Sequence, residues 1–171
     1  MLHLLVPVES QSQKRQKPGF LEAGGRCWVL EDHSEAFRKG HPPSYHCVSY
    51  ACGDQEVPHP LDPSRSISSL AIPVLEEAIR DADPDAIWID AFCIPSQEPA
   101  RSECLGLMGA VYSKAESVVV VLSDEFKSVL KEVKETGSIS SATLSLLENE
   151  RWINRAWTYQ VSHGAGSRNV R

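Results

Sequence analysis

The sequence predicts an α/β protein in which a parallel sheet is flanked by helices in a three-layer architecture. Short apolar runs that suit buried strands alternate along the chain with segments of helical periodicity. The run at residues 117–123, SVVVVLS, shows no alternation of apolar and polar residues, which is typical of a parallel strand buried on both faces. With 171 residues, of which 42% are hydrophobic, the chain has about the length of one domain.

The first 44 residues are expected to contribute little to the core. Residues 9–19 are polar, lack an apolar period and end in Pro18 and Gly19, which favours a flexible loop. Residues 26–30 suit a short strand, and residues 31–43 are charged and loop-like. We therefore predict a partly flexible N-terminal extension over residues 1–44, an organised domain over residues 45–160 and an unstructured tail over residues 161–171.

Three strands are expected in the organised domain, at residues 45–50, 86–90 and 117–123. A loop marked by prolines, residues 57–65, separates the first strand from a helix at residues 68–82. Apolar side chains spaced by three and four define one face of this helix. Pro73 suits its first turn, where the missing N–H costs little, and Pro84 enforces its end.

A longer helix is predicted between the second and third strands, at about residues 98–115. Its apolar face carries Cys104, Leu107, Met108, Val111, Tyr112 and Ala115. Its back carries a stripe of small residues: Ser102, Gly106, Gly109 and Ser113. Small residues permit close approach of another backbone, so we predict a helix-packing interface, within the domain or between copies. The alternative is a solvent-exposed face. Further helices are expected at residues 124–136 and 141–148.

Composition and cysteine usage exclude several classes of protein. A net charge of −6 gives no reason to expect nucleic acid or an anionic membrane as partner. The odd number of cysteines, five, and the lack of a signal peptide or membrane-spanning run predict a cytoplasmic protein with reduced thiols. The cysteines lack the C-x-x-C spacing of zinc sites, so no metal is expected. Standard hydrolase, P-loop and dinucleotide-binding motifs are absent from the sequence.

Polar residues stand at the ends of all three expected strands of the domain, where ligands gather in a parallel sheet, and those of the third strand are Ser123 and Asp124. The first strand ends with Ser49 and Tyr50 and is followed by Gly53 and Asp54. Asp90 follows the second strand and suits a ribose hydroxyl or a proton, or alternatively caps the next helix. Cys93 lies nearby at a helix start, where a reactive thiol is conceivable. The alternative for Cys93 is a buried, inert thiol.

Four blocks of the sequence, in order, resemble the fungal heterokaryon incompatibility (HET) domain. They read YHCVSYACGD at residues 45–54, IWIDAFCI at 87–94, MGAVYSKA at 108–115 and RWINRAWTYQ at 151–160. The second block is the most specific. The resemblance implies an effector or signalling domain in self/non-self recognition and programmed cell death, acting through self-association, a sensor protein or another HET-domain protein.

The resemblance also implies a fold distantly similar to Toll/interleukin-1-receptor (TIR) domains, in a TIR- or flavodoxin-like architecture. Some TIR domains cleave NAD with a helix glutamate, so an NAD glycohydrolase with NAD as its substrate is the alternative function. Asp90 and Glu103 are then the candidate catalytic residues. The candidate ligand-binding residues are Ser49, Tyr50, Gly53, Asp54, Cys93, Arg101, Trp157 and Gln160.

The sequence also departs from the family pattern. Cys52 stands where the family has tryptophan, Ala100 replaces the glutamate before Arg101, and Val161 replaces the final glutamate. Pro95 and Ser96 displace an Asn-Gln pair, so that Gln97 arrives late. Two acidic positions are lost, and a degenerate, inactive member of the family is therefore a third alternative. Glu98 or Glu103 would have to replace a lost catalytic carboxylate.

Overall fold

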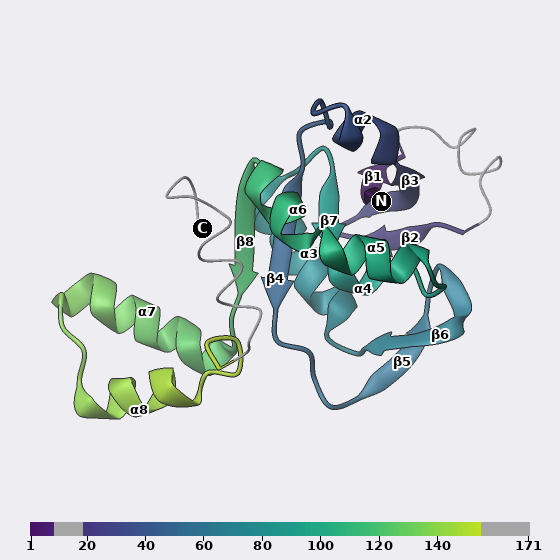
Figure 1. Cartoon of the computed structure of the whole chain (residues 1–171). Helices are drawn as coiled ribbons and strands as arrows, with labels where there is room; N and C mark the ends of the chain where they lie inside the picture. The colour runs from purple at the N-terminus through teal and green to yellow at the C-terminus, as the bar shows by residue number, and fades with distance from the viewer. Residues whose placement is uncertain (9–18, 155–171) are drawn as a thin grey trace.

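The computed structural model describes residues 1–8 and 19–154, which form a six-stranded sheet with helices on both faces (Figure 1). The expected α/β class is confirmed. The strands of the sheet lie in the order β2 (Leu21–Ala23), β3 (Arg26–Asp32), β1 (His3–Pro7), β7 (Ile87–Ile89), β4 (His46–Tyr50) and β8 (Ser117–Val121).

One half of the sheet is parallel and consists of the three strands expected in the domain. β4 lies in the middle, with His46 opposite Ile87 of β7 on one side and opposite Ser117 of β8 on the other. The β7 side chains and the first residues of β8 are buried, as the apolar runs predict. Trp88 is completely buried in this core.

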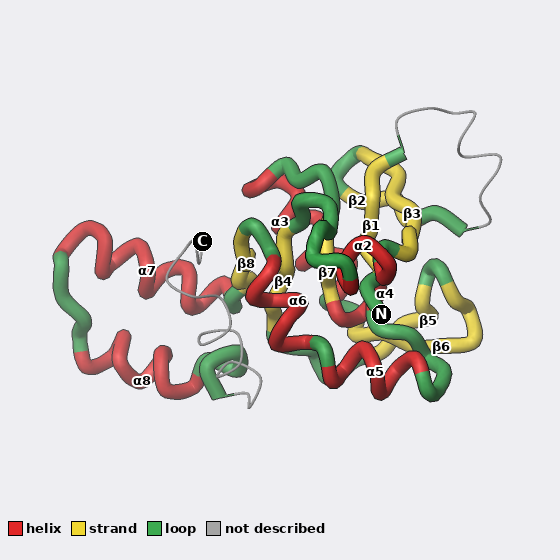
Figure 2. Tube along the Cα trace, turned by 45° about the horizontal axis from the view of Figure 1, so that its top comes forward, coloured by secondary structure: helices red, strands yellow, loops and turns green. Residues whose placement is uncertain are grey.

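The connections between the parallel strands run in opposite directions. From β4 the chain passes through α3 (Ala71–Ala82) to β7, and then returns across β4 through α5 (Ala100–Gly106) and α6 (Met108–Lys114) to β8. Because such crossovers are almost always right-handed, the two connections lie on opposite faces of the sheet. Figures 1 and 2 show α3 on one face and α5 and α6 on the other. The direction changes between β4 and β8, and α/β folds commonly bind ligands at such a point.

The other half of the sheet is antiparallel and comes from the first 32 residues. β1 pairs with β3 along its length and meets β7 at Leu5 and Ile87, while β2 pairs with β3. Leu4, Leu5 and Trp28 have no solvent exposure. The expectation that this segment adds little core is therefore wrong: it supplies half of the strands and several of the largest buried side chains. The domain boundaries remain a prediction.

The helices differ from the expected ones mainly at one break. α3 carries Pro73 in its first turn and ends at Asp83, whose φ of 43° closes the helix before Pro84. The helix expected at residues 98–115 is divided at Leu107 into α5 and α6. Its apolar side is nevertheless buried at Cys104, Met108, Val111 and Tyr112. Gly106 and Gly109 flank the break, where their low helix propensity makes an interruption inexpensive.

The remaining elements are short or lie at the edge. A two-stranded hairpin, β5 (Glu56–His59) and β6 (Asp62–Ser68), replaces most of the loop expected at residues 57–65. The short helices α2 (Ser34–Arg38) and α4 (Asp90–Cys93) follow β3 and β7. Beyond β8, α7 (Asp124–Thr136) and α8 (Ser141–Asn149) form an outlying hairpin (Figure 1). Within the described residues, no helix has the length and apolar character needed to cross a membrane.

Candidate functional site

A pocket of about 220 Å³ opens at the carboxyl ends of β4 and β7, on the side covered by α5 and α6. Ser49 and Tyr50, the last residues of β4, line it together with Asp90, which directly follows β7. The strand-end rule predicts a ligand site at the carboxyl ends of such parallel strands. With Arg101 of α5, the structure thus brings four of the sequence-predicted site residues into one pocket.

Helices α5 and α6 supply the outer wall of this strand-end pocket. Arg101 lies on α5 with an exposed side chain, and Met108 and Tyr112 come from α6. The Tyr112 ring packs edge-on against buried Trp88, with 5.4 Å between the ring centroids. That contact holds the tyrosine in a fixed orientation against the sheet. The pocket therefore combines a carboxylate, a guanidinium and aromatic rings.

The end of the described chain closes the strand-end pocket from outside. The indole Nε1 of Trp152 donates a hydrogen bond to the Ser49 hydroxyl at 2.8 Å, and Trp152 lines the pocket. The neighbouring Arg151 forms an ion pair with Asp54 at 3.1 Å. Both contacts join residues about a hundred positions apart. The chain after α8 therefore packs directly on the polar end of β4.

Asp90 lies in the first turn of α4, whose N-cap is Ile89, and it also lines the strand-end pocket. Its Oδ1 accepts a hydrogen bond from the backbone N–H of Ala91 at 2.7 Å, in the first turn of α4. The side chain is half-buried and faces the strand-end pocket. The local bond orients the carboxylate, and its position in the pocket leaves it within reach of a ligand. Stabilising the helix start and contacting a ligand are compatible here.

Four of the predicted site residues lie outside this pocket. Gly53 donates its N–H to the Ser68 hydroxyl, and Asp54 is 84% exposed beside Arg151. Glu103 is also exposed and forms an ion pair with the N-terminal amine of Met1 at 3.2 Å. It lies two positions from Arg101, and residues two apart point to different sides of a helix. The structure therefore does not bring Glu103 and Asp90 into one pocket.

Cys93 is the fourth of these residues. It has no solvent exposure, and its thiol lies 3.8 Å from the carbonyl oxygen of Ile87. Burial raises the pKa of Cys93 to about 12. A thiol in such surroundings stays protonated and is a poor nucleophile. The surroundings of Cys93 therefore match the alternative interpretation, in which this cysteine is buried and inert.

The small-residue stripe on α5 and α6 faces outward. Ser102, Gly106, Gly109 and Ser113 are all exposed, and a Cβ added to either glycine would meet no atom within 4 Å in the described structure. Packing of the stripe against another described element is therefore excluded. The contact between copies remains a prediction.

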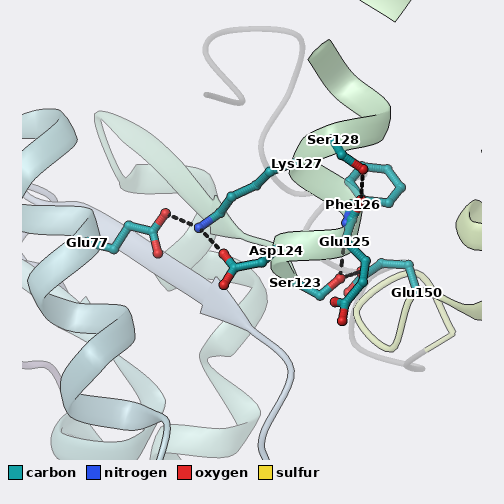
Figure 3. Close-up of polar contacts among 8 residues, drawn as sticks. All are labelled: Glu77, Ser123, Asp124, Glu125, Phe126, Lys127, Ser128 and Glu150. Carbon is teal, nitrogen blue, oxygen red and sulfur yellow. Dashed lines mark hydrogen bonds and ion pairs between the residues drawn. The ribbon is translucent and has the colours of Figure 1, made fainter. Parts of the chain in front are cut away.

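A second pocket, of about 460 Å³, adjoins the first at Tyr50 and is lined by Ser123 and Asp124, the residues at the end of the third expected strand. It lies between α3, the end of β8 and the start of α7. In Figure 3 the Lys127 ammonium lies between the carboxylates of Glu77 and Asp124, at 2.5 and 3.0 Å. The hydrogen bond that Lys127 donates to Glu77, followed by the one that it donates to Asp124, raises the pKa of Lys127. The lysine charge is thus balanced inside the pocket wall. In the sequence, the spacing of Asp124 and Lys127 by three residues was the signal for an ion pair on one helix.

Two predicted ligand-binding residues, Trp157 and Gln160, lie outside the described residues. Over residues 1–8 and 19–154, no group of three or more histidine, cysteine, aspartate or glutamate side chains could hold a metal ion.

Comparison with known proteins gives one match. A scan against protein families matches residues 45–160 to the family described as heterokaryon incompatibility protein (HET). The matched segment includes all the residues that line the strand-end pocket. Searches of curated proteins and of solved structures found no match. The similarity to TIR domains therefore remains a prediction.

Proposed function

The chain belongs to the heterokaryon incompatibility (HET) family, and from this we propose that it is an effector or signalling domain in self/non-self recognition. One observation carries the proposal. Two sequence blocks that resemble the family contribute Ser49, Tyr50 and Asp90 to one pocket at the carboxyl ends of β4 and β7. In this proposal, a small polar ligand in the strand-end pocket switches the domain on, and growth arrest or cell death follows.

The pocket has the chemistry that such a ligand needs. Asp90 offers a carboxylate oriented by the Ala91 N–H, and Arg101 brings a guanidinium that suits carboxylate or phosphate groups. Tyr50, Tyr112 and Trp152 provide aromatic surface around these charges. A compact ligand with hydroxyl or anionic groups and a flat apolar part is complementary to this lining.

Growth of a fungal host that expresses the full chain tests the proposal. The wild-type chain should arrest growth, and Asp90→Asn should relieve the arrest because it removes the pocket charge with almost no change in shape. Asp85→Asn is the matched control, since Asp85 is exposed just before β7, at the opposite end of the strand. Harmless wild-type protein, or equal arrest by wild type and Asp90→Asn, would contradict the proposal.

We propose that signalling also requires contact with a second copy or a partner through the stripe of Ser102, Gly106, Gly109 and Ser113. Exposure of both glycines with open space above them supports this, because another backbone could approach closely. Leucine at Gly106 and Gly109 should abolish growth arrest and, if copies associate, shift sedimentation toward the monomer. If the double variant arrests growth and sediments as the wild type does, the interface hypothesis is wrong.

A second candidate function is an NAD glycohydrolase, favoured by the presence of Asp90 and Arg101 in one pocket. In that reaction the bond between nicotinamide and ribose breaks, water adds to the ribose carbon, and a carboxylate stabilises the developing positive charge. Glu103 does not line this pocket, so Asp90 is the carboxylate to test. Nicotinamide release by wild type and its loss in Asp90→Asn would support the enzyme; no release at high protein concentration would exclude it.

A further inference from the structure

A third pocket, separate from the proposed signalling site, lies where the β5–β6 hairpin packs beside α4 and the start of β1. Its volume is about 300 Å³, at the lower end of the range of about 300–1,000 Å³ that small-molecule sites occupy. Ile94 is the one residue that it shares with the lining of the strand-end pocket. It is called the hairpin pocket below.

The base of the hairpin pocket is largely apolar. Phe92 from α4 is buried, and Leu61 and Ile94 are partly or fully buried. Leu30 from β3 also lines it and leaves 38% of its surface exposed. An apolar ligand body would cover this leucine and gain hydrophobic stabilisation in proportion to the area removed from water.

Arg65 places a positive charge at this apolar pocket. Its side chain is half-buried, and the structure gives its guanidinium one hydrogen bond, from Nη1 to the Ile94 carbonyl oxygen at 3.2 Å. Within the described part of the chain it forms no ion pair. A guanidinium carries five N–H donors in a planar fork that matches a carboxylate. Most of these donors therefore remain to be satisfied by water or a ligand.

His59 adds a buried donor of fixed identity. Its Nδ1 accepts the backbone N–H groups of Leu61 and Asp62 at 3.1 and 3.0 Å, so the neutral ring carries its proton on Nε2. The residue is 3% exposed and packs edge-on against Phe92. Burial, followed by the positive charge of Arg65, lowers the pKa of His59, and the carbonyl of Ala91 opposes this shift. No described acceptor reaches hydrogen-bonding geometry with Nε2. An unsatisfied buried donor is costly, and a ligand oxygen would relieve that cost.

We propose that the hairpin pocket binds a small monocarboxylate with an apolar body, with its carboxylate on Arg65 and on the Nε2–H of His59. The apolar floor contacts the ligand body. Asp62 also lines the pocket, but its Oδ1 accepts the N–H and hydroxyl of Ser64, at 3.2 and 2.6 Å, and so is directed toward its own turn. Its charge weakens the binding of an anion without occupying Arg65.

Calorimetric titration of the full chain with octanoate tests this site. Saturable binding of one octanoate is expected, with octan-1-ol, its uncharged analogue, binding at least tenfold more weakly because it lacks the ion pair. Arg65→Gln should weaken octanoate binding by about tenfold or more. Arg80→Gln, which removes an exposed arginine on α3, is the matched control and should bind as the wild type does.

Two further variants separate binding from folding. His59→Asn keeps an oxygen that can accept the Leu61 and Asp62 N–H groups but changes the donor, and should weaken octanoate binding severalfold. Asp62→Asn keeps the turn and removes the repelling charge, and should strengthen binding. Circular dichroism checks that each variant is folded. Absence of saturable binding, equal binding of octanol and octanoate, or wild-type affinity in Arg65→Gln would overturn the proposal. Growth assays of Asp90→Asn are independent of this outcome.

Discussion

The Trp152 indole connects two distant parts of the sequence through one hydrogen bond. Its partner is the hydroxyl of Ser49, which is the penultimate residue of β4 and is buried. A tryptophan usually finds an acceptor for its N–H when it packs against a protein surface, and here the acceptor lies in the pocket itself. The stability of the C-terminal region and the shape of the strand-end pocket therefore depend on the same contact.

Trp152→Phe should lower the free energy of unfolding by about 1 kcal/mol beyond the loss of packing, because it removes this hydrogen bond. Ser49→Ala should have a similar effect, and the double variant should cost less than the sum of the two. Urea denaturation of the four proteins measures this coupling. Strictly additive free energies would show that the hydrogen bond contributes nothing.

Buried thiols are expected to make the protein less stable as the pH rises into the alkaline range. Burial raises the pKa of Cys93 to about 12, and burial also raises that of Cys47. Both thiols stay protonated in the fold, while in the unfolded chain they ionise near their ordinary pKa of 9.0. Their contribution to stability is thus complete below about pH 9 and falls as the pH rises toward the folded pKa, by up to about 1.4 kcal/mol per pH unit and thiol.

Urea denaturation at pH 8, 9 and 10 measures this dependence. Cys93→Ala should have a shallower decline above pH 9, because one of the thiols that ionise only on unfolding is gone. Cys52→Ser is the control: Cys52 is exposed, so the decline should match that of the wild type. Identical slopes in wild type and Cys93→Ala would contradict the assignment.

At the scale of elements, the junction between β8 and α7 has an unusually connected serine. The Ser123 hydroxyl caps α7 by accepting the Phe126 N–H at 3.3 Å and donates to the carboxylate of Glu150 at 2.6 Å (Figure 3). Glu150 is only 5% exposed and follows α8 directly. One side chain thus joins the start of α7 to the end of α8.

Ser123→Ala should therefore destabilise the protein by about 1–2 kcal/mol, through loss of the cap and of a hydrogen bond to a buried carboxylate. Ser128→Ala is the matched control, because the Ser128 hydroxyl is exposed and, among the described residues, bonds only to the Glu125 carbonyl (Figure 3). It should change stability by less than about 0.5 kcal/mol. Thermal denaturation compares the two. An equal loss in both variants would argue against the connecting role of Ser123.

Elements with a strong local period were predictable, and those specified by distant pairing were not. The runs of β4, β7 and β8 and the apolar faces of α3 and α7 could be identified because period and punctuation lie within the segment itself. β1 was not predicted, because its burial pattern does not alternate and its partners lie elsewhere in the chain. The break at Leu107 was not predicted either, because the apolar period of the sequence continues across it without interruption.

The same distinction applies to the candidate site. The strand-end rule located Ser49, Tyr50 and Asp90, because it depends only on where each strand stops. It could not separate Asp90 from Cys93, which points into the core three residues later. Nor could it reveal that Trp152 closes the pocket, since that contact spans 103 positions.

At the scale of the whole molecule, the matched family segment is not a self-contained core. β7 has β1 on one side, and β1 brings Leu4 and Leu5 into the common hydrophobic core with Trp28 of β3. Without the first 44 residues, β7 would become an exposed edge beside a large apolar surface. Exposed apolar strand edges promote aggregation.

A fragment of residues 45–171 should therefore fail to fold to a monomer, whereas the full chain should fold. Size-exclusion chromatography and circular dichroism check the prediction. A peptide of residues 1–33, added during refolding, should restore soluble protein in part, because it supplies β1, β2 and β3. A monomeric, cooperatively unfolding fragment without the peptide would show that the family segment has a sufficient core.

The placement of β1 also sets the timing of assembly during synthesis. β1, β2 and β3 pair with near neighbours and can form as soon as the first 32 residues have been made. The other edge of β1 must wait for Ile87, the partner of Leu5, which is translated 55 residues after Asp32, the last residue of β3. At about 5–20 residues per second, that delay is roughly 3–11 s. During this interval the first part of the sheet to be built has an open edge, whose unpaired backbone groups can pair with another chain.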